Sequence, residues 1–275
     1  MLHSIKKPHS NQEKFINVLV TGSSGFLGKN LIPLLEKEQY VKVFAPSHKE
    51  CNLLEKKDIC RALNNFKTTR IIHLAALCGG IKANQNSPGS FFYENLQMGI
   101  NLIQAAKEYN ISQLICLGST CSYPANPNTL PFIEEEMFDN GEPEPTNAPY
   151  GHSKRTLFLM LKAYFEQYKL HSIFLVPSNM YGKHDHFEGE NTHVIPAIIS
   201  KIYQAKKENT NVRLWGSGNC TREFLYASDC AQAILKAIYT PYHHYPSPIK
   251  IGTGNEISIK ELAFKIAHLM DFKKT

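Results

Sequence analysis

Residues 16–28 read INVLVTGSSGFLG and join a short β-branched run to a turn that carries three glycines. The run is typical of a buried strand, and residues 27–38 have the apolar periodicity of a helix. Glycine in such a turn lets the backbone approach a pyrophosphate, while the helix N-terminus offers unpaired N–H groups and the positive end of its dipole. The stretch therefore predicts a dinucleotide-binding turn; the alternative is an ordinary turn between a strand and a helix.

The alternation of short and long segments continues along the chain. Four more β-branched runs follow, each separated from the next by a longer amphipathic stretch. The expected strands are residues 16–22, 41–45, 70–76, 113–119 and 171–178, and the expected helices are residues 27–38, 53–66, 91–110 and 149–168. This order predicts an α/β fold with a doubly wound parallel sheet, helices on both faces and a ligand beyond the carboxyl ends of the strands.

The texture of the sequence changes after residue 178. Loops rich in glycine, histidine and asparagine precede an expected helix over residues 194–207, a short expected strand over residues 212–215 (VRLW) and a glycine-rich turn. We expect a dinucleotide-binding domain over residues 14–178, with sheet elements that return near 212–252, and a smaller interleaved lobe over residues 179–275.

Composition excludes several classes of protein. The chain has 275 residues, 43% of them apolar, and its net charge of +6 comes from scattered lysines rather than from a basic stripe. That pattern argues against nucleic acid as a partner and suits a small anionic ligand. No apolar run is long enough to span a membrane, and seven cysteines without a C-x-x-C pair fit neither a disulfide framework nor a metal site. We therefore expect a cytoplasmic protein with no metal, no nucleic acid and no membrane partner.

The residues after the second expected strand indicate which dinucleotide is bound. Dinucleotide-binding folds often place an acidic residue about 20 positions beyond the glycines, where it holds the adenosine ribose. Here Ser47, His48 and Lys49 precede the first acid, Glu50. A hydroxyl and cationic groups favour the additional phosphate of NADP, so NADPH is the expected cofactor; the alternative is that Lys49 is a solvated loop residue.

Tyr150 and Lys154 are four residues apart in PYGHSK and therefore share one face of a helix. An ammonium beside a phenol lowers the pKa of the phenol, which makes the tyrosine a proton donor or acceptor near neutral pH. Ser119 ends the fourth expected strand, where its hydroxyl can hydrogen-bond the same reacting oxygen. Together the three residues predict acid-base chemistry on one oxygen atom.

Five features together resemble the extended short-chain dehydrogenase/reductase family, whose members act on nucleotide sugars. They are TGSSGFLG, HLAALCGG, Ser119, YGHSK and PSNMYG. The resemblance implies a Rossmann-type fold in which Ser119, Tyr150 and Lys154 are the catalytic trio. It also implies that NADPH contacts Gly22, Ser23, Ser24, Gly25, Phe26, Leu27, Gly28, Ser47, Ala75, Ala76, Lys154, Pro177, Ser178, Asn179 and Met180.

Further segments resemble, in order along nearly the whole chain, the branch of that family that acts on GDP-4-keto-6-deoxy-D-mannose. They are GGIKAN, GSTCSYP, EPTNAPYGHSK, HVIPAII, WGSGNCTREFLYASD and IGTGNEISIKELA. Members of this branch epimerise and reduce the sugar. The resemblance therefore implies an NADPH-dependent epimerase-reductase with a GDP-sugar as its substrate.

Epimerisation beside a ketone needs a base on one face of the sugar and an acid on the other. The resemblance assigns these roles to Cys121, within GSTCSYP, and to His193, directly before VIP. It assigns binding of the GDP-sugar to Lys201, Trp215 and Arg222. The alternatives are a cysteine that only fills the core, a histidine without a catalytic role, a tryptophan that anchors the core and an arginine that braces a loop.

Two departures from this branch concern the substrate. Residues 181–187 read YGKHDHF where the branch usually has YGPHDNF, and the chain ends at MDFKKT where family members continue, so part of the sugar-binding lobe is expected to be absent. Alternatives are therefore an epimerase-reductase or reductase of another GDP-4-keto sugar, including a heptose analogue, and a non-catalytic dinucleotide-binding protein. The resemblance also implies a homodimer, joined through a four-helix bundle that residues 91–110 and 149–168 supply.

Overall fold

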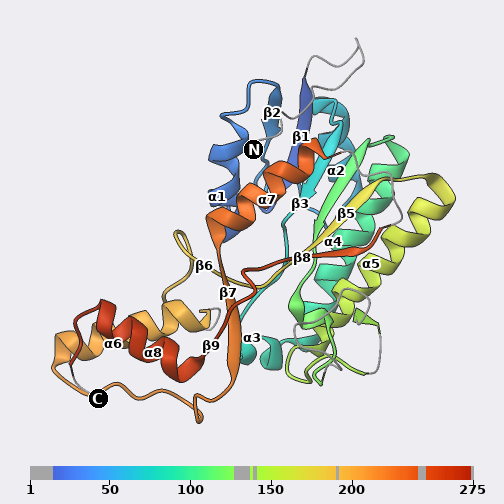
Figure 1. The fold of residues 1–275 in the computed structure, drawn as a ribbon. Coiled ribbons are helices and arrows are strands. Elements are labelled where there is room, and N and C mark those ends of the chain that lie inside the picture. The colour runs from blue at the N-terminus through green and yellow to red at the C-terminus, as the bar shows by residue number, and fades with distance from the viewer. Residues whose placement is uncertain (1–14, 127–136, 139–140, 190–191, 241–245, 274–275) are drawn as a thin grey trace.

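The computed structural model describes residues 15–126, 137–138, 141–189, 192–240 and 246–273. Its larger part is a six-stranded parallel sheet in the order β2-β1-β3-β4-β5-β8, with helices on both faces (Figure 1). The strands are β1 (Ile16–Thr21), β2 (Val41–Phe44), β3 (Arg70–His73), β4 (Gln113–Leu117), β5 (Ser172–Pro177) and β8 (Pro248–Ile251). The five expected strands and the doubly wound α/β sheet are confirmed.

Two layers of helices enclose this sheet. On one face α1 (Phe26–Leu35) lies beside α7 (Ala227–Tyr239), and Leu31 and Ile234 meet there in one apolar core. On the other face α2 (Lys56–Phe66), α4 (Pro88–Glu108) and α5 (Ala148–Tyr168) cover a second core. A short α3 (Ile81–Asn86) precedes α4. Both faces of every central strand are therefore buried, which explains why these strands read as continuous apolar runs.

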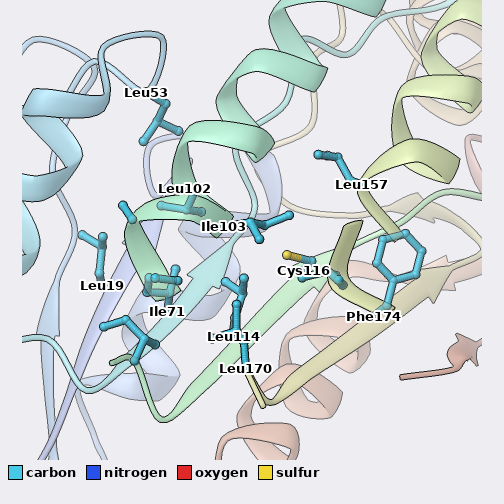
Figure 2. Packing of buried hydrophobic residues seen from close by; sticks show 14 of the residues in the cluster. Leu19, Leu53, Ile71, Leu102, Ile103, Leu114, Cys116, Leu157, Leu170 and Phe174 are labelled. Atoms are coloured by element: carbon cyan, nitrogen blue, oxygen red, sulfur yellow. The ribbon is translucent and has the colours of Figure 1, made fainter. Parts of the chain in front are cut away.

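The second core fixes the helix that carries Tyr150 and Lys154. Figure 2 shows Leu19, Ile71, Leu114 and Phe174 of the sheet facing residues of α4 and α5, and their side chains are almost completely buried. The two helices approach closely at Gly99, where a Cβ atom would overlap the side chain of Leu157. Each such apolar side chain contributes about 1.5–3 kcal/mol by leaving water. Helix α5 is thus held rigidly on the sheet.

A smaller lobe follows the fifth strand. Its strands β6 (Asn179–Tyr181), β7 (Thr221–Tyr226) and β9 (Glu256–Ser258) form a separate three-stranded sheet. Its helices α6 (Val194–Glu208) and α8 (Ile259–Leu269) pack against each other through Ile198, Ile202, Leu262 and Ile266. The residue bounds given above for the two lobes stay a prediction.

The expected strand over residues 212–215 is wrong. Val212 and Leu214 pack against the core between α6 and α8, but the segment pairs with no strand in the part of the chain that the structure describes. The carbonyl of Arg213 instead accepts a hydrogen bond from Lys201 Nζ at 3.3 Å. The apolar alternation of VRLW therefore reflects packing on helices, not on a sheet.

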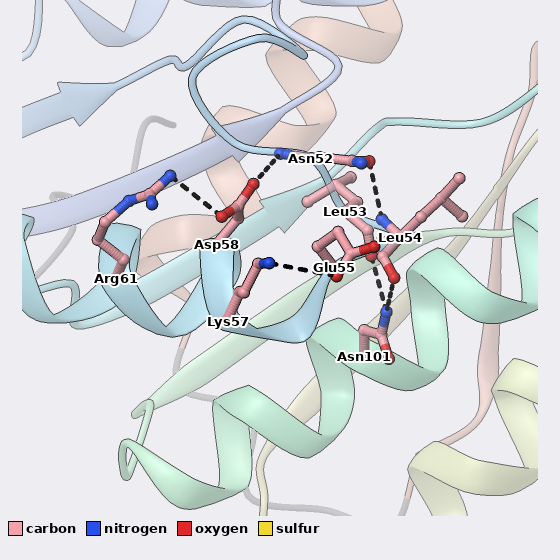
Figure 3. Close-up of polar contacts among 8 residues, drawn as sticks. All are labelled: Asn52, Leu53, Leu54, Glu55, Lys57, Asp58, Arg61 and Asn101. Atoms are coloured by element: carbon pink, nitrogen blue, oxygen red, sulfur yellow. Dashed lines mark hydrogen bonds and ion pairs between the residues drawn. The ribbon is translucent and has the colours of Figure 1, made fainter.

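Polar contacts fix the loop that follows β2 (Figure 3). Asn101 of α4 donates from Nδ2 to the carbonyls of Leu53 and Leu54 at 2.9 and 3.0 Å. The backbone N–H of Asn52 donates to Oδ2 of Asp58 in α2 at 3.4 Å, and Asp58 also forms an ion pair with Arg61 at 3.1 Å. The loop beyond β2 is therefore anchored at its far end to α2 and α4.

Candidate active site

The glycine turn after β1 is too crowded for side chains. Gly22 has a φ of +72°, and a Cβ atom there would lie 2.6 Å from the backbone nitrogen of Ala75. A Cβ atom on Gly28 would overlap the carbonyl oxygens of Gly22 and Ser23. Helix α1 can therefore approach the turn this closely only because residue 28 is glycine. Helix α1 begins without a side-chain cap and without an acidic residue in its first turn. Its N-terminus therefore suits an anionic group such as a pyrophosphate.

The predicted cofactor residues lie at one edge of the sheet, because the strands that precede them are parallel. Gly22 to Gly28 follow β1, Ala75 and Ala76 follow β3, and Pro177 to Met180 end β5 and begin β6. Ser178 is buried, and its hydroxyl has no hydrogen-bond partner within the described residues. A buried hydroxyl without a partner is the kind of group that a bound cofactor satisfies. The edge thus fits a dinucleotide.

Ser47 is exposed at the end of β2, and both of its donors contact one carboxylate. Its backbone N–H and its hydroxyl lie 2.7 and 2.8 Å from Glu50 Oε2. These bonds lower the pKa of Glu50. In the sequence Glu50 stands out only as the first acid after Lys49, and this pairing was not predicted, although a serine followed by a glutamate three residues later is a known pairing motif.

Ser119, Tyr150 and Lys154 come together beyond the carboxyl end of β4. Ser119 precedes a 3₁₀ turn (Thr120–Ser122) and accepts the backbone N–H of Cys121 on Oγ at 3.1 Å. Lys154 is buried, and its ammonium lies 5.7 Å from the centre of the Tyr150 ring. That ammonium donates to the carbonyl of Leu117, the last residue of β4, at 3.0 Å. The helical spacing of Tyr150 and Lys154 therefore brings both onto the strand end that carries Ser119.

The expected effect of Lys154 on Tyr150 is wrong for this structure. Burial raises the pKa of Tyr150 well above its usual value, and a hydrogen bond with Ser119 only partly opposes this. Burial also lowers the pKa of Lys154. The physical reason is that desolvation penalises both charged forms, while the lysine is directed at a carbonyl. Tyr150 is therefore a protonated phenol, and burial makes it a weaker acid than an ordinary tyrosine.

Cys121 lies on the 3₁₀ turn that Ser119 precedes and caps. The start of α5 packs directly on this turn, since a Cβ atom on Gly151 would overlap the carbonyl oxygen of Cys121. Burial raises the pKa of the Cys121 thiol, and a hydrogen bond with Ser119 opposes the shift. A second thiol, missed by sequence reasoning, stands nearby: Cys78 Sγ lies 3.7 Å from Tyr150 Oη. Its place in the loop that follows β3, at the carboxyl end of the sheet, was the signal that could have found it.

His193 belongs to the smaller lobe. It is the residue before α6, and its Nδ1 lies 3.2 Å from Oδ1 of Asp185. No contact joins His193 to Cys121 or Tyr150 within the residues that the structure describes. The sequence had grouped these residues by family resemblance alone.

The three predicted GDP-sugar residues also lie on the smaller lobe. The ammonium of Lys201 is 5.1 Å from the centre of the Trp215 ring. Trp215 is 85% exposed, so it is not a core anchor. Arg222 is exposed as well, and its Nη1 donates to the neighbouring carbonyl of Thr221 at 2.7 Å. An exposed indole with a cation beside it, and a separate exposed guanidinium, are suited to a base and to phosphates.

Within the described ranges, no helix is long and apolar enough to cross a membrane, and no three His, Cys, Asp or Glu side chains are arranged to hold a metal ion.

Comparison with known proteins places this geometry in a family context. A profile of the NAD dependent epimerase/dehydratase family matches residues 18–252. GDP-L-colitose synthase of Yersinia pseudotuberculosis is 39% identical over 94% of this chain and 84% of its own length. GDP-L-fucose synthase of Escherichia coli (strain K12) is 33% identical over 93% of this chain and 82% of its own. A crystal structure of a GDP-L-fucose synthetase from Naegleria fowleri bound to NADP is 29% identical, covers 95% of this chain and 80% of that one, and superposes with a TM-score of 0.86.

Proposed function

Because the chain belongs to the NAD dependent epimerase/dehydratase family, we propose that it is an NADPH-dependent epimerase-reductase that converts GDP-4-keto-6-deoxy-D-mannose to GDP-L-fucose. One observation carries the proposal: Ser119 caps the 3₁₀ turn that carries Cys121, and this turn lies against the start of α5, the helix that carries Tyr150 and Lys154. A reductase needs Ser119, Tyr150 and Lys154, but only an epimerase needs the thiol of Cys121.

The residues that would hold NADPH are the glycine turn, Ser47 and the residues that follow β3 and β5. When bound, the cofactor supplies a hydride to the ketone carbon. The turn would receive the pyrophosphate at the N-terminus of α1, and the buried hydroxyl of Ser178 offers a hydrogen bond near the end of β5. The relative of known structure with NADP bound supports this cofactor.

Reduction of the ketone also needs one proton on its oxygen. Tyr150 would donate that proton, since its phenol is protonated at neutral pH and burial keeps it so. The hydroxyl of Ser119 would hydrogen-bond the same oxygen and so favour the developing alkoxide. Lys154 would then assist the return of a proton to Tyr150, from its buried position between Leu117 and the phenol ring.

Epimerisation precedes this step in the proposed sequence. The C4 ketone acidifies the hydrogens on C3 and C5. Cys121 would remove a proton from one face of the sugar as the thiolate, the form that its hydrogen bond with Ser119 favours against the effect of burial. His193 would return a proton to the opposite face, so each inversion leaves the numbers of protons and electrons unchanged. Since the two residues come from different lobes, a sugar that binds between the lobes can meet both.

The GDP moiety would bind on the smaller lobe. We assign the base to the exposed ring of Trp215, beside the ammonium of Lys201, and a phosphate to Arg222. The surplus positive charge of the chain favours this anionic substrate.

We also propose that the protein works as a homodimer in the cytoplasm. Helices α4 and α5 lie side by side and expose Phe92, Tyr93 and Leu159, which are 38%, 61% and 50% accessible (Figure 1). A four-helix bundle with a second copy would cover them. All seven cysteines are free, as in a reducing compartment. Sedimentation that shows only a monomer at micromolar concentration would contradict the dimer.

A second candidate is the same chemistry on another GDP-4-keto sugar. GDP-L-colitose synthase is 39% identical to the chain, whereas the GDP-L-fucose synthase of Escherichia coli is 33% identical. L-Colitose lacks the 3-hydroxyl of L-fucose, so C3 of its precursor has nothing to invert and only C5 would be epimerised.

Two substrates separate these candidates: GDP-4-keto-6-deoxy-D-mannose and its 3-deoxy analogue. Each is incubated with the protein and NADPH. The proposed function predicts loss of NADPH absorbance with GDP-4-keto-6-deoxy-D-mannose and a product identical to GDP-L-fucose by NMR. Faster turnover of the 3-deoxy sugar would favour the second candidate. Cofactor binding without oxidation by either sugar, or by a heptose analogue, would contradict both and indicate a dinucleotide-binding protein without this activity.

A further inference from the structure

Asp185 is a buried carboxylate in an otherwise exposed loop. The loop joins β6 to α6, and the residues on either side of Asp185, His184 and His186, are exposed. The side chain of Asp185 is nevertheless only 1% exposed. Burial of a carboxylate is costly unless its hydrogen bonds repay the lost hydration. Its contacts therefore need an explanation.

One oxygen of this carboxylate makes all of its hydrogen bonds in the described part of the chain. Oδ1 accepts the backbone N–H of His186 at 2.8 Å and lies 3.2 Å from Nδ1 of His193. Oδ2 is buried without a partner among the described residues. His193 is thus the one side chain found to donate to Asp185 within that part of the structure.

The contact with Asp185 fixes which nitrogen of His193 carries the hydrogen. It is the N-cap residue of α6, but its side chain does not cap the helix. A carboxylate accepts hydrogen bonds and does not donate them, so the hydrogen of a neutral imidazole must sit on Nδ1. Nε2 is then the nitrogen that remains free, on a side chain that is 44% exposed. The same arrangement fixes the tautomer of catalytic and metal-binding histidines in general.

We propose that Asp185 is a positioning residue that holds the Nδ1–H of His193 and so presents Nε2 to the sugar. The inference rests on the proposed role of His193 as a proton donor in epimerisation. The donating form is the imidazolium, in which Nε2 also carries a hydrogen; Nε2 gives that hydrogen to the sugar, and the neutral ring that remains keeps its hydrogen on Nδ1 beside Asp185. Asp185 is not among the site residues that the family resemblance implied. The proposal also gives the loop between β6 and α6 a function. A purely structural role, in which the bond only ties this loop to α6, is the alternative.

The tautomer of His193 tests this in the unmodified protein. NMR of protein labelled with ¹⁵N-histidine, with the His193 signals assigned from the His193→Gln variant, reports which ring nitrogen carries the hydrogen. The proposal predicts Nδ1–H at a pH where the ring is neutral. A predominant Nε2–H tautomer would overturn it.

The variant Asp185→Asn tests the consequence for the reaction. An amide of the same shape can donate as well as accept, so it no longer dictates the tautomer. We expect kcat and the rate of deuterium incorporation into the sugar to fall about 10- to 100-fold, the usual cost of losing the partner of a functional histidine. The KM for the GDP-sugar and NADPH binding should stay within about twofold of wild type, whereas a merely structural role would move them. Glu188→Gln, an exposed carboxylate in the same loop, is the matched control and should be silent.

The outcomes separate this inference from the proposed function. If His193→Gln loses deuterium incorporation while Asp185→Asn keeps the wild-type rate, only the positioning role of Asp185 fails. If His193→Gln itself keeps the wild-type rate, the role of His193 in epimerisation fails and the inference falls with it.

Discussion

Replacing His73 with asparagine should remove a large part of the acid sensitivity of the fold. His73 ends β3 in register with Thr21 of β1, and its Nδ1 shares a hydrogen bond of 2.8 Å with the Thr21 hydroxyl. That hydroxyl in turn accepts the backbone N–H of Ala75 at 3.4 Å. His73 thus lies beneath the glycine turn and couples the two strand ends that border the predicted cofactor site.

The magnitude follows from the pKa of this histidine. Burial, with the Lys154 ammonium nearby, lowers the pKa of His73 from 6.5 to about 3. Below about pH 6.5 the unfolded chain therefore binds a proton that the folded protein does not bind, so stability is lost as the pH falls. Each pH unit in this window costs about 1.4 kcal/mol, and the loss between pH 6.5 and pH 5 is about 2 kcal/mol.

Urea unfolding, followed by far-ultraviolet circular dichroism at about pH 7 and pH 5, measures how much the free energy of unfolding falls with pH. Wild type should lose about 2 kcal/mol more of its free energy of unfolding than His73→Asn over that interval. His48→Asn, a change at an exposed histidine, should behave like wild type. Parallel losses in wild type and His73→Asn would refute the reasoning, because they would mean that the fold does not exclude a proton from His73.

Three further predictions concern the cofactor and the reduction. Tyr150→Phe should lower the rate of NADPH oxidation by about 10²- to 10⁴-fold and leave NADPH binding nearly unchanged, because only the proton donor is lost; wild-type turnover would show that the trio is misassigned. Gly28→Ala should cost about 1–3 kcal/mol of stability and weaken NADPH binding in a fluorescence titration, because the methyl overlaps the carbonyls of the glycine turn, whereas Gly89→Ala, with open space around it, should do neither. NADPH should bind at least about tenfold more tightly than NADH, and Ser47→Ala should reduce that ratio; equal affinities in wild type would remove the case for a phosphate site at the end of β2.

The main sheet could be predicted from the sequence because each of its elements has a local signal. The runs that became β1, β3, β4 and β5 are continuous and apolar, as expected for strands covered on both faces. The helix that begins at Ala148 has a proline near its start, where the fixed φ of proline suits a helix. Each of these signals is contained within a few consecutive residues, so it can be read without knowing the rest of the fold.

Predictions failed where the outcome depends on distant parts of the chain. The segment VRLW alternates like a strand, but its side chains meet α6 and α8, which lie on either side of it in the sequence. The direction of the Tyr150 pKa shift depends on burial and on the neighbouring thiols of Cys78 and Cys121, none of which the spacing of Tyr150 and Lys154 contains. The contact between Asp185 and His193 likewise depends on how the loop before α6 folds back.

Deuterium incorporation from heavy water is the most direct test of an epimerase-reductase. Wild-type protein with GDP-4-keto-6-deoxy-D-mannose and NADPH should give a product that carries deuterium at C3 and C5, seen as lost signals in its proton NMR spectrum. Cys121→Ser replaces the thiol with a hydroxyl that is a far weaker acid, and it should suppress incorporation while NADPH binding persists. His193→Gln should stall at an incompletely epimerised product. Unchanged incorporation at both carbons in Cys121→Ser would contradict the central claim, since Cys121 would then only fill space beside the reductase trio.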